Sequence, residues 1–167
     1  MTDQAELRRA LAAARVNALR TGRRIEVHRR DICRPGGHAD GRAYDVVVSN
    51  PPYVPAPPSR DAGRAHRAAR AWDAGPDGRR VVDALCRAST GLLRRGGVLL
   101  MVHSALCGPQ LTVDLLTGLG LSADIGARAR VPLGPVLRSR LPWLRARGLP
   151  AATDEEEELV VIRAERP

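Results

Sequence analysis

Residues 45–53 read DVVVSNPPY, and this stretch decides the fold that the sequence predicts. Residues 46–48 are all valine, and a β-branched run without polar alternation is typical of a strand covered on both faces of a sheet. Asn50 follows at the carboxyl end of that strand. The two prolines after it cannot extend a strand ladder, and each restricts the residue before it to an extended conformation. We therefore predict a buried central strand that ends in a stiff loop, with the Asn50 carboxamide held in one direction.

The residues after this strand carry a family resemblance. In open parallel sheets, ligands bind outside the carboxyl ends of the strands, where this loop is expected. Asn50-Pro51-Pro52-Tyr53 resembles the signature of class I methyltransferases that use S-adenosylmethionine to methylate a planar nitrogen, in a glutamine amide or in the exocyclic amino group of adenine or cytosine. The alternative is a proline-rich turn after a core strand, because a tetrapeptide is a short motif. The context on both sides favours the methyltransferase interpretation.

The composition predicts one small domain that spans residues 1–167. The chain has 167 residues, of which 44% are hydrophobic and 27% are charged, enough for a single core. No apolar run approaches the roughly 20 residues of a membrane span, and the first residues lack the charged and apolar regions of a signal peptide. We therefore expect a cytoplasmic protein without membrane contact.

Charge and cysteine content say less about function. The net charge of +9 would favour an acidic partner such as nucleic acid. However, all 27 basic residues are Arg, and Ala and Gly are abundant, which indicates a compositional bias in the coding sequence. The three cysteines are odd in number and widely spaced, so we expect reduced thiols and no metal site.

The segment before the central strand extends the resemblance. Residues 5–20 have an apolar stripe at helical spacing, Gly22 can close that helix, and residues 25–28 alternate like a short strand. This order resembles the region between the second and third strands of the same methyltransferases, where an acidic residue accepts a hydrogen bond from the adenine amino group. The resemblance implies that Asp31, with Ile32 beside it, binds the adenine of S-adenosylmethionine, and that Asn50 belongs to the cofactor-binding residues as well. The alternative for Asp31 is a solvated residue at a strand end.

Residues 54–80 are interpreted as a loop on the substrate side. They are rich in Pro, Ala, Arg, Asp and Gly, contain Trp72 as a candidate lid residue, and end in Gly75-Pro76-Asp77-Gly78. In the resembled family a Gly-x-Asp-Gly segment precedes a helix. We expect Asp77 to cap that helix, whose apolar stripe comprises Val81, Leu85, Ala88 and Leu92.

The remainder fits the second half of a Rossmann-like sheet. Residues 98–103 predict a second buried strand, with His103 at its end as a structural residue rather than a base, and residues 109–119 predict an amphipathic helix. Residues 121–130 are a weaker strand candidate, and residues 131–154 an irregular excursion with one short helix. A charged turn at 154–158 then precedes a last strand at 159–162, which in this fold inserts antiparallel beside the fifth strand. The predicted class is α/β, mostly parallel with an antiparallel last strand.

One part of the family pattern is missing from the sequence. Members open with a strand and a Gly-rich turn that faces the methionine part of the cofactor, and neither precedes residue 5. The resemblance therefore favours an N-terminally truncated sheet, in which one flank of the central strand is exposed. The alternative is a genuinely short protein.

The resemblance also implies a mechanism. The Asn50 side-chain oxygen and the Pro51 carbonyl would accept both N–H groups of the target nitrogen, and Tyr53 would pack against the planar group, with no strong base. The chain looks closest to the methyltransferases that modify a glutamine of translation release factors. The alternatives are an adenine or cytosine methyltransferase acting on DNA or RNA, and a non-catalytic binding module on the same scaffold. The sequence leaves the oligomeric state open.

Overall fold

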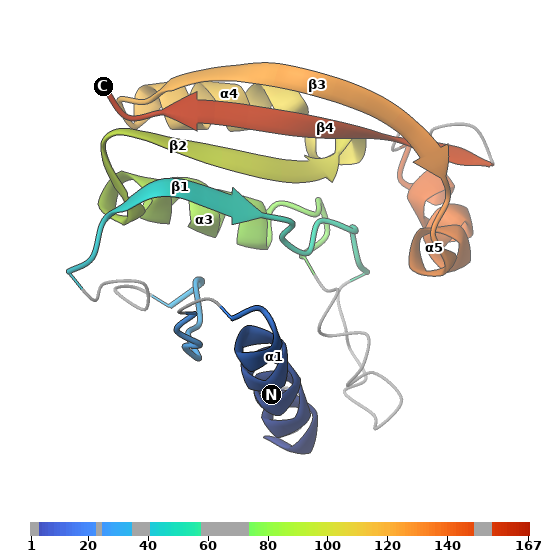
Figure 1. The fold of residues 1–167 in the computed structure, drawn as a ribbon. Helices are drawn as coiled ribbons and strands as arrows, with labels where there is room; N and C mark the ends of the chain where they lie inside the picture. Colours follow the sequence, from blue (N-terminus) through green and yellow to red (C-terminus); the bar gives the residue numbers. More distant parts are fainter. Residues whose placement is uncertain (1–3, 23–24, 35–40, 58–73, 149–154) are drawn as a thin grey trace.

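The computed structural model describes residues 4–22, 25–34, 41–57, 74–148 and 155–167. Their strands form one sheet, in the order β1-β2-β4-β3 (Figure 1). The strands are β1 (Tyr44–Ser49), β2 (Leu93–Ser104), β3 (Ser122–Pro132) and β4 (Glu156–Glu165). The helices are α1 (Gln4–Arg20), α3 (Arg80–Leu92), the 3-10 turn η2 (Ala105–Cys107), α4 (Pro109–Gly118) and α5 (Pro135–Ala146).

The strand directions confirm the predicted class. β1 and β2 are parallel, and β4 is antiparallel to both β2 and β3. Three of the four described strands therefore point the same way, and the last strand lies reversed between two of them. The register places Val47 beside Leu99 and His103 beside Val160. The carboxyl ends of β1 and β2 consequently meet at one edge of the sheet.

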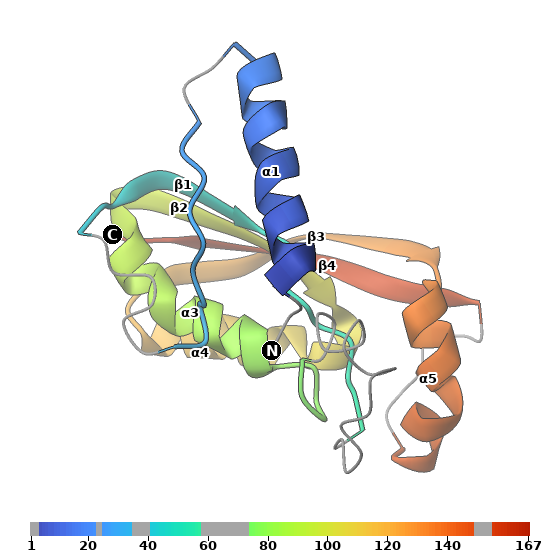
Figure 2. The ribbon, with the colours of Figure 1, turned by 90° about the horizontal axis from the view of Figure 1, so that it is seen from below.

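The main core lies between the sheet and two helices. α3 and α4 pack beside each other on one face (Figure 2), as their apolar stripes predict. Successive strand residues point to opposite faces, so every second residue of β2 and β4 enters this core. Its fully buried members include Val82, Cys86, Leu99, Met101, Leu116, Val160 and Ile162.

β1 is not the strand buried on both faces that the valine run predicted. Val46 is 55% exposed and Val48 is 73% exposed, whereas Val47 packs against the main core. β1 forms an edge of the described sheet, because β2 is its one neighbour in the strand order. The valine run is typical of a strand that is covered on both faces, but the described residues cover only one face of β1.

Two predictions for the N-terminal segment had different outcomes. The helix at 5–20 is confirmed as α1, which lies beyond β1 and outside the layered part of the fold (Figures 1 and 2). The predicted strand at 25–28 is wrong, because residues 25–31 belong to no strand and Ile25 is 50% exposed. Alternation favours an extended chain, but a strand also requires a hydrogen-bonded neighbour.

The C-terminal third is more regular than expected. The strand candidate at 121–130 is confirmed as β3. The irregular excursion contains α5, a helix of 12 residues with Pro135 in its first turn and a small core of its own around Leu137, Leu141 and Leu144. The prediction of a charged turn at 154–158 is wrong from residue 156 onward, because β4 begins at Glu156 and Glu157 is only 6% exposed. Pairing with β3 extends β4 and directs alternate side chains inward.

Candidate active site

The segment 50–57 lies where the sequence placed it, at the carboxyl end of β1. β1 ends at Ser49, and β2 runs into η2 at the same edge. Asn50 is exposed, Pro51 is buried, and Pro52 is half-buried. Tyr53 is also half-buried and packs against the main core. The loop therefore presents the exposed Asn50 carboxamide next to residues that are buried or packed against the core.

The backbone of the next four residues is held from three directions. The Cys107 thiol donates to the Tyr53 carbonyl oxygen over 3.1 Å. Arg140 Nη1, from α5, donates to the carbonyl oxygens of Val54 and Pro55 over 3.1 and 2.9 Å. The Ala56 N–H donates to the Gly75 carbonyl oxygen over 2.9 Å. We refer to residues 50–56 as the substrate loop.

Gly78 allows the substrate loop to approach α3 closely. A Cβ placed on Gly78 would lie 2.3 Å from the Tyr53 carbonyl oxygen and 2.8 Å from the Cys107 sulfur. Its φ of +75° is also in the region that L side chains rarely adopt. Gly78, the last residue of the Gly-x-Asp-Gly segment, is therefore needed here for space and backbone conformation.

Asp77 does not cap α3 as expected. The residue at the N-cap position is Arg79, and it makes no capping hydrogen bond with its side chain. Instead, Asp77 Oδ1 accepts the Arg79 N–H over 3.0 Å, which is a local turn contact. Asp77 thus shapes the turn that brings Gly78 against Tyr53.

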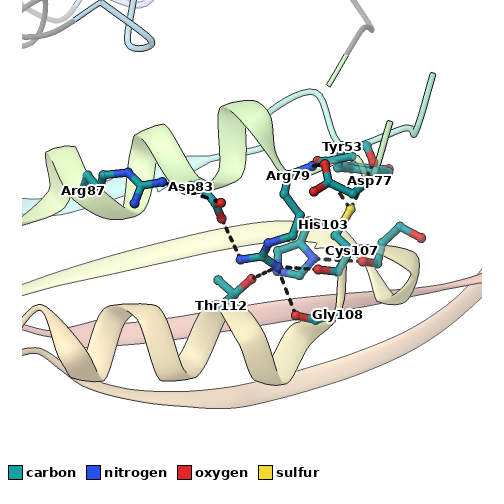
Figure 3. A network of polar contacts seen from close by, with 11 residues as sticks. Tyr53, Asp77, Arg79, Asp83, Arg87, His103, Cys107, Gly108 and Thr112 are labelled. Atoms are coloured by element: carbon teal, nitrogen blue, oxygen red, sulfur yellow. Dashed lines mark hydrogen bonds and ion pairs between the residues drawn. The ribbon is translucent and has the colours of Figure 1, made fainter. Parts of the chain in front are cut away.

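Arg79 was missed by the sequence analysis, although it makes the largest set of contacts near the loop (Figure 3). Its Nη1 donates to the carbonyl oxygens of Cys107 and Gly108 and to Thr112 Oγ1, the latter two over 3.2 Å each. Its Nη2 forms an ion pair with Asp83 at 2.6 Å. The Arg79–Asp83 spacing of four residues on one helix was the available signal, since such pairs face each other.

The electrostatics around Tyr53 are set by burial. Burial raises the pKa of the Tyr53 phenol, and the negative charges that Glu157 and Cys107 carry when ionised raise it further. Burial also raises the pKa of the Glu157 carboxyl, against the effect of a hydrogen bond with the Ser104 side chain. Cys107 has its pKa raised to about 12, mainly by burial, so its thiol keeps the proton that it donates. The Tyr53 phenol and the Cys107 thiol that donates to the loop are thus both uncharged at neutral pH.

His103 is buried and neutral. Burial lowers the pKa of its ring, and Nδ1 lies 2.9 Å from the Ser104 carbonyl oxygen. Within the described parts of the chain, His103 Nε2 and Glu157 Oε2 are the buried side-chain polar atoms without a hydrogen-bond partner. A fully buried ring at the end of β2 fits the structural role predicted for it.

The adenine-binding residues of the prediction lie on a different segment. Asp31 is exposed, and its Oδ1 accepts the Cys33 N–H over 3.0 Å. Ile32 is half-buried against the main core. Figure 2 shows this extended segment passing beside α3. No hydrogen bond joins Asp31 or Ile32 to the substrate loop among the residues that the structure describes.

Several other expectations concern residues outside the described ranges. Trp72 and most of the substrate-side loop at 54–80 lie there, as does the end of the excursion at 131–154. In the described ranges, no three His, Cys, Asp or Glu side chains are grouped so that they could hold a metal ion. None of the described helices combines the length and apolar character that crossing a membrane requires.

Comparison with known proteins gives relatives of one kind. No protein-family model matches the chain. The chain is 36% identical over 89 residues to a putative protein N5-glutamine methyltransferase of Methanocaldococcus jannaschii. That alignment covers 53% of this chain and 44% of that protein. The chain is 33% identical over 137 residues to the release factor glutamine methyltransferase of Mycobacterium tuberculosis, which covers 80% of this chain and 44% of that protein. The chain thus spans less than half the length of these curated relatives.

A solved structure supports the fold. The YcgJ protein of Bacillus subtilis superposes with a TM-score of 0.53 at 9% identity, over 94% of this chain and 78% of that one. At this identity the likeness concerns the fold alone.

Proposed function

We propose that this chain, which is related in sequence to the release factor glutamine methyltransferases, transfers a methyl group from S-adenosylmethionine to the side-chain amide of a protein glutamine. The observation that carries the proposal is the substrate loop. Asn50 is exposed at the carboxyl edge of the sheet, and four residues after Pro52 are tied through their backbone. Such a loop presents hydrogen-bond acceptors in a fixed position, as a planar N–H₂ group requires.

The chemistry follows from the weakness of an amide nitrogen as a nucleophile, since its lone pair is delocalised into the carbonyl. The Asn50 side-chain oxygen and the Pro51 carbonyl accept the two N–H groups and stabilise positive charge as it develops on the nitrogen. This is electrostatic preorganisation, which lowers the barrier because the acceptors are already in place. A general base is not part of the proposal, and the neutral, buried ring of His103 agrees with that.

The residues at 31–32 fit the adenine of the cofactor. Asp31 is an exposed carboxylate, which can only accept hydrogen bonds when ionised, and the adenine amino group donates them. Ile32 beside it offers a half-buried apolar surface. S-adenosylmethionine, when bound, supplies an electrophilic methyl group on a sulfonium. We propose that Asp31 and Ile32 hold the adenine while the substrate loop holds the acceptor amide.

The proposed substrate is a peptide chain release factor, as the names of the relatives suggest. The test is methylation of a release factor and of an oligonucleotide in parallel, by the chain and by Asn50→Ala. We expect one methyl group on a glutamine of the release factor, detected by mass spectrometry of the peptides. Loss of one preorganised hydrogen-bonding group should lower kcat by roughly 100-fold or more.

Asn17→Ala is the matched control, because Asn17 is also exposed but lies on α1. It should leave kcat unchanged, and both variants should unfold at the temperature of the unmodified chain. Methylation of the oligonucleotide instead of the protein would overturn the substrate class. Turnover by Asn50→Ala within threefold of the unmodified chain would overturn the role of Asn50.

A further inference from the structure

The substrate loop depends on its carbonyl groups for attachment. Residues 50–56 read NPPYVPA, and the three prolines among them carry no N–H. A loop of this composition can offer few donors. Its attachments accordingly use the carbonyl oxygens of Tyr53, Val54 and Pro55, with the Ala56 N–H as the donor among them. Tyr53 is the first residue after the two adjacent prolines, and its carbonyl oxygen is the attachment point nearest to Asn50 in the chain.

Cys107 supplies the donor for that attachment point. Its thiol lies 3.1 Å from the Tyr53 carbonyl oxygen and 3.6 Å from the Gly78 carbonyl oxygen. The side chain is only 2% exposed, and burial favours the protonated thiol that can donate. A thiol is a weak donor, so its hydrogen bond with the Tyr53 carbonyl oxygen depends on how the Cys107 backbone is placed.

Arg79 fixes the backbone of Cys107. Its guanidinium donates to the Cys107 carbonyl oxygen and, over 3.2 Å, to the neighbouring Gly108 carbonyl oxygen. The Asp83 carboxylate holds the other arm of the same guanidinium at 2.6 Å (Figure 3). The planar fork of Arg suits this arrangement, because its donors keep fixed relative directions. The start of α3 is thereby connected through η2 to the substrate loop.

We propose that Cys107, with its backbone held by Arg79, is a positioning residue for methyl transfer, which sets the place of Tyr53 and hence of Asn50. The inference rests on the proposed function of the substrate loop. Neither residue touches the reacting atoms; each acts through the Tyr53 carbonyl oxygen. Small displacements of a group that orients a substrate have large effects on rate, so a weak but well-placed contact has consequences for kcat.

The first test compares Cys107→Ala with Cys107→Ser. We expect Cys107→Ala to lower kcat by about fivefold to tenfold, the equivalent of one hydrogen bond, with little change in KM. Cys107→Ser keeps a donor and should recover most of the rate. Cys86→Ala is the matched control, since it removes the same atom from another buried cysteine, on α3 in the main core. It should lower stability but leave kcat unchanged.

The second test does not require activity. The sequence contains two tyrosines, so Tyr44→Phe leaves Tyr53 as the sole phenol, whose ionisation is followed by ultraviolet absorbance. Release of the loop in Cys107→Ala should shift the Tyr53 pKa down toward its ordinary value, because the shift arises mainly from burial. Cys107→Ser should keep the raised pKa. If Cys107→Ala and Cys107→Ser lowered the Tyr53 pKa equally, the effect would come from loss of the Cys107 charge and not from release of the loop, which would contradict the proposal.

The two tests separate this inference from the proposed function. An unmodified chain without methyl transfer, in which Cys107→Ala still shifts the Tyr53 pKa, would overturn the proposed function and retain the attachment of the loop. An active chain in which Cys107→Ala changes neither kcat nor the Tyr53 pKa would overturn the positioning role.

Discussion

Gly78 and Tyr53 are so close that Gly78 has no room for a side chain: its Cβ would lie 2.3 Å from the Tyr53 carbonyl oxygen. Gly78→Ala must therefore move the substrate loop, in addition to the cost of a positive φ for Ala, about 1–2 kcal/mol. We expect a lower melting temperature and a kcat reduced by about tenfold or more. Thermal unfolding and methyl-transfer kinetics measure the two effects.

Gly120→Ala is the control for that substitution. Gly120 has a φ of +87° and no atom within 4 Å of its Cβ position, so the variant carries the conformational cost without the collision. It should be destabilised yet keep its kcat. Equal kinetic losses in both variants would contradict the importance of the Gly78–Tyr53 contact.

Asp31→Ala should weaken cofactor binding and leave the fold unchanged. Asp31 is exposed, and its Oδ1 makes one local turn contact with the Cys33 N–H. Loss of a charged hydrogen-bond acceptor should raise the Kd for S-adenosylmethionine by about tenfold to 100-fold, as measured by calorimetry. Asp124→Ala removes another exposed carboxylate, on β3, and should have no effect on Kd. Unchanged binding by Asp31→Ala would exclude Asp31 from the cofactor site.

Glu157→Gln should stabilise the fold at neutral pH. Burial raises the Glu157 pKa above the value of 4.5, so the folded state holds a proton at pH values where the unfolded chain has lost it. The free energy of unfolding therefore falls as pH rises from about 4.5 through the raised pKa. At pH values above the raised pKa, the folded protein keeps this loss of stability, because Glu157 is ionised while buried. Replacement by Gln removes the cost, because Gln does not ionise.

The measurement for Glu157 is the melting temperature as a function of pH. The advantage of Glu157→Gln should be largest at neutral pH and should disappear as pH falls below 4.5. Glu156→Gln is the control, since Glu156 is the exposed neighbour on the same strand. A uniform advantage at all pH values would show that ionisation of Glu157 is not the cause.

The three cysteines should differ in reactivity. Cys33 is exposed, whereas Cys86 and Cys107 are buried and have their pKa values raised to about 12. Because the thiolate is the reactive form, an alkylating reagent at neutral pH should modify Cys33 alone in the folded chain. Mass spectrometry after labelling, with and without denaturant, measures this. Rapid modification of Cys107 in the folded state would contradict its buried contact with Tyr53.

Local sequence determined much of this protein. α1, α3, α4, β2 and the loop after β1 follow from apolar periodicity, glycine and proline, because these features act within a few residues. The placement of Asn50 at the carboxyl end of β1 followed from the valine run and the prolines after it, whereas the antiparallel last strand came from the resemblance to a family. Arg79 lay beside its helical partner Asp83, so that pair was within reach of a sequence argument.

The tertiary structure decided what depends on distant partners. Val46 and Val48 are exposed because the described residues cover one face of β1, which its composition alone does not reveal. Glu157 is buried because β3 extends the pairing of β4 into an acidic run. Cys107 meets Tyr53 across 54 residues of chain. Secondary structure is a local preference, whereas burial and side-chain pairing depend on which segments the folded chain brings together.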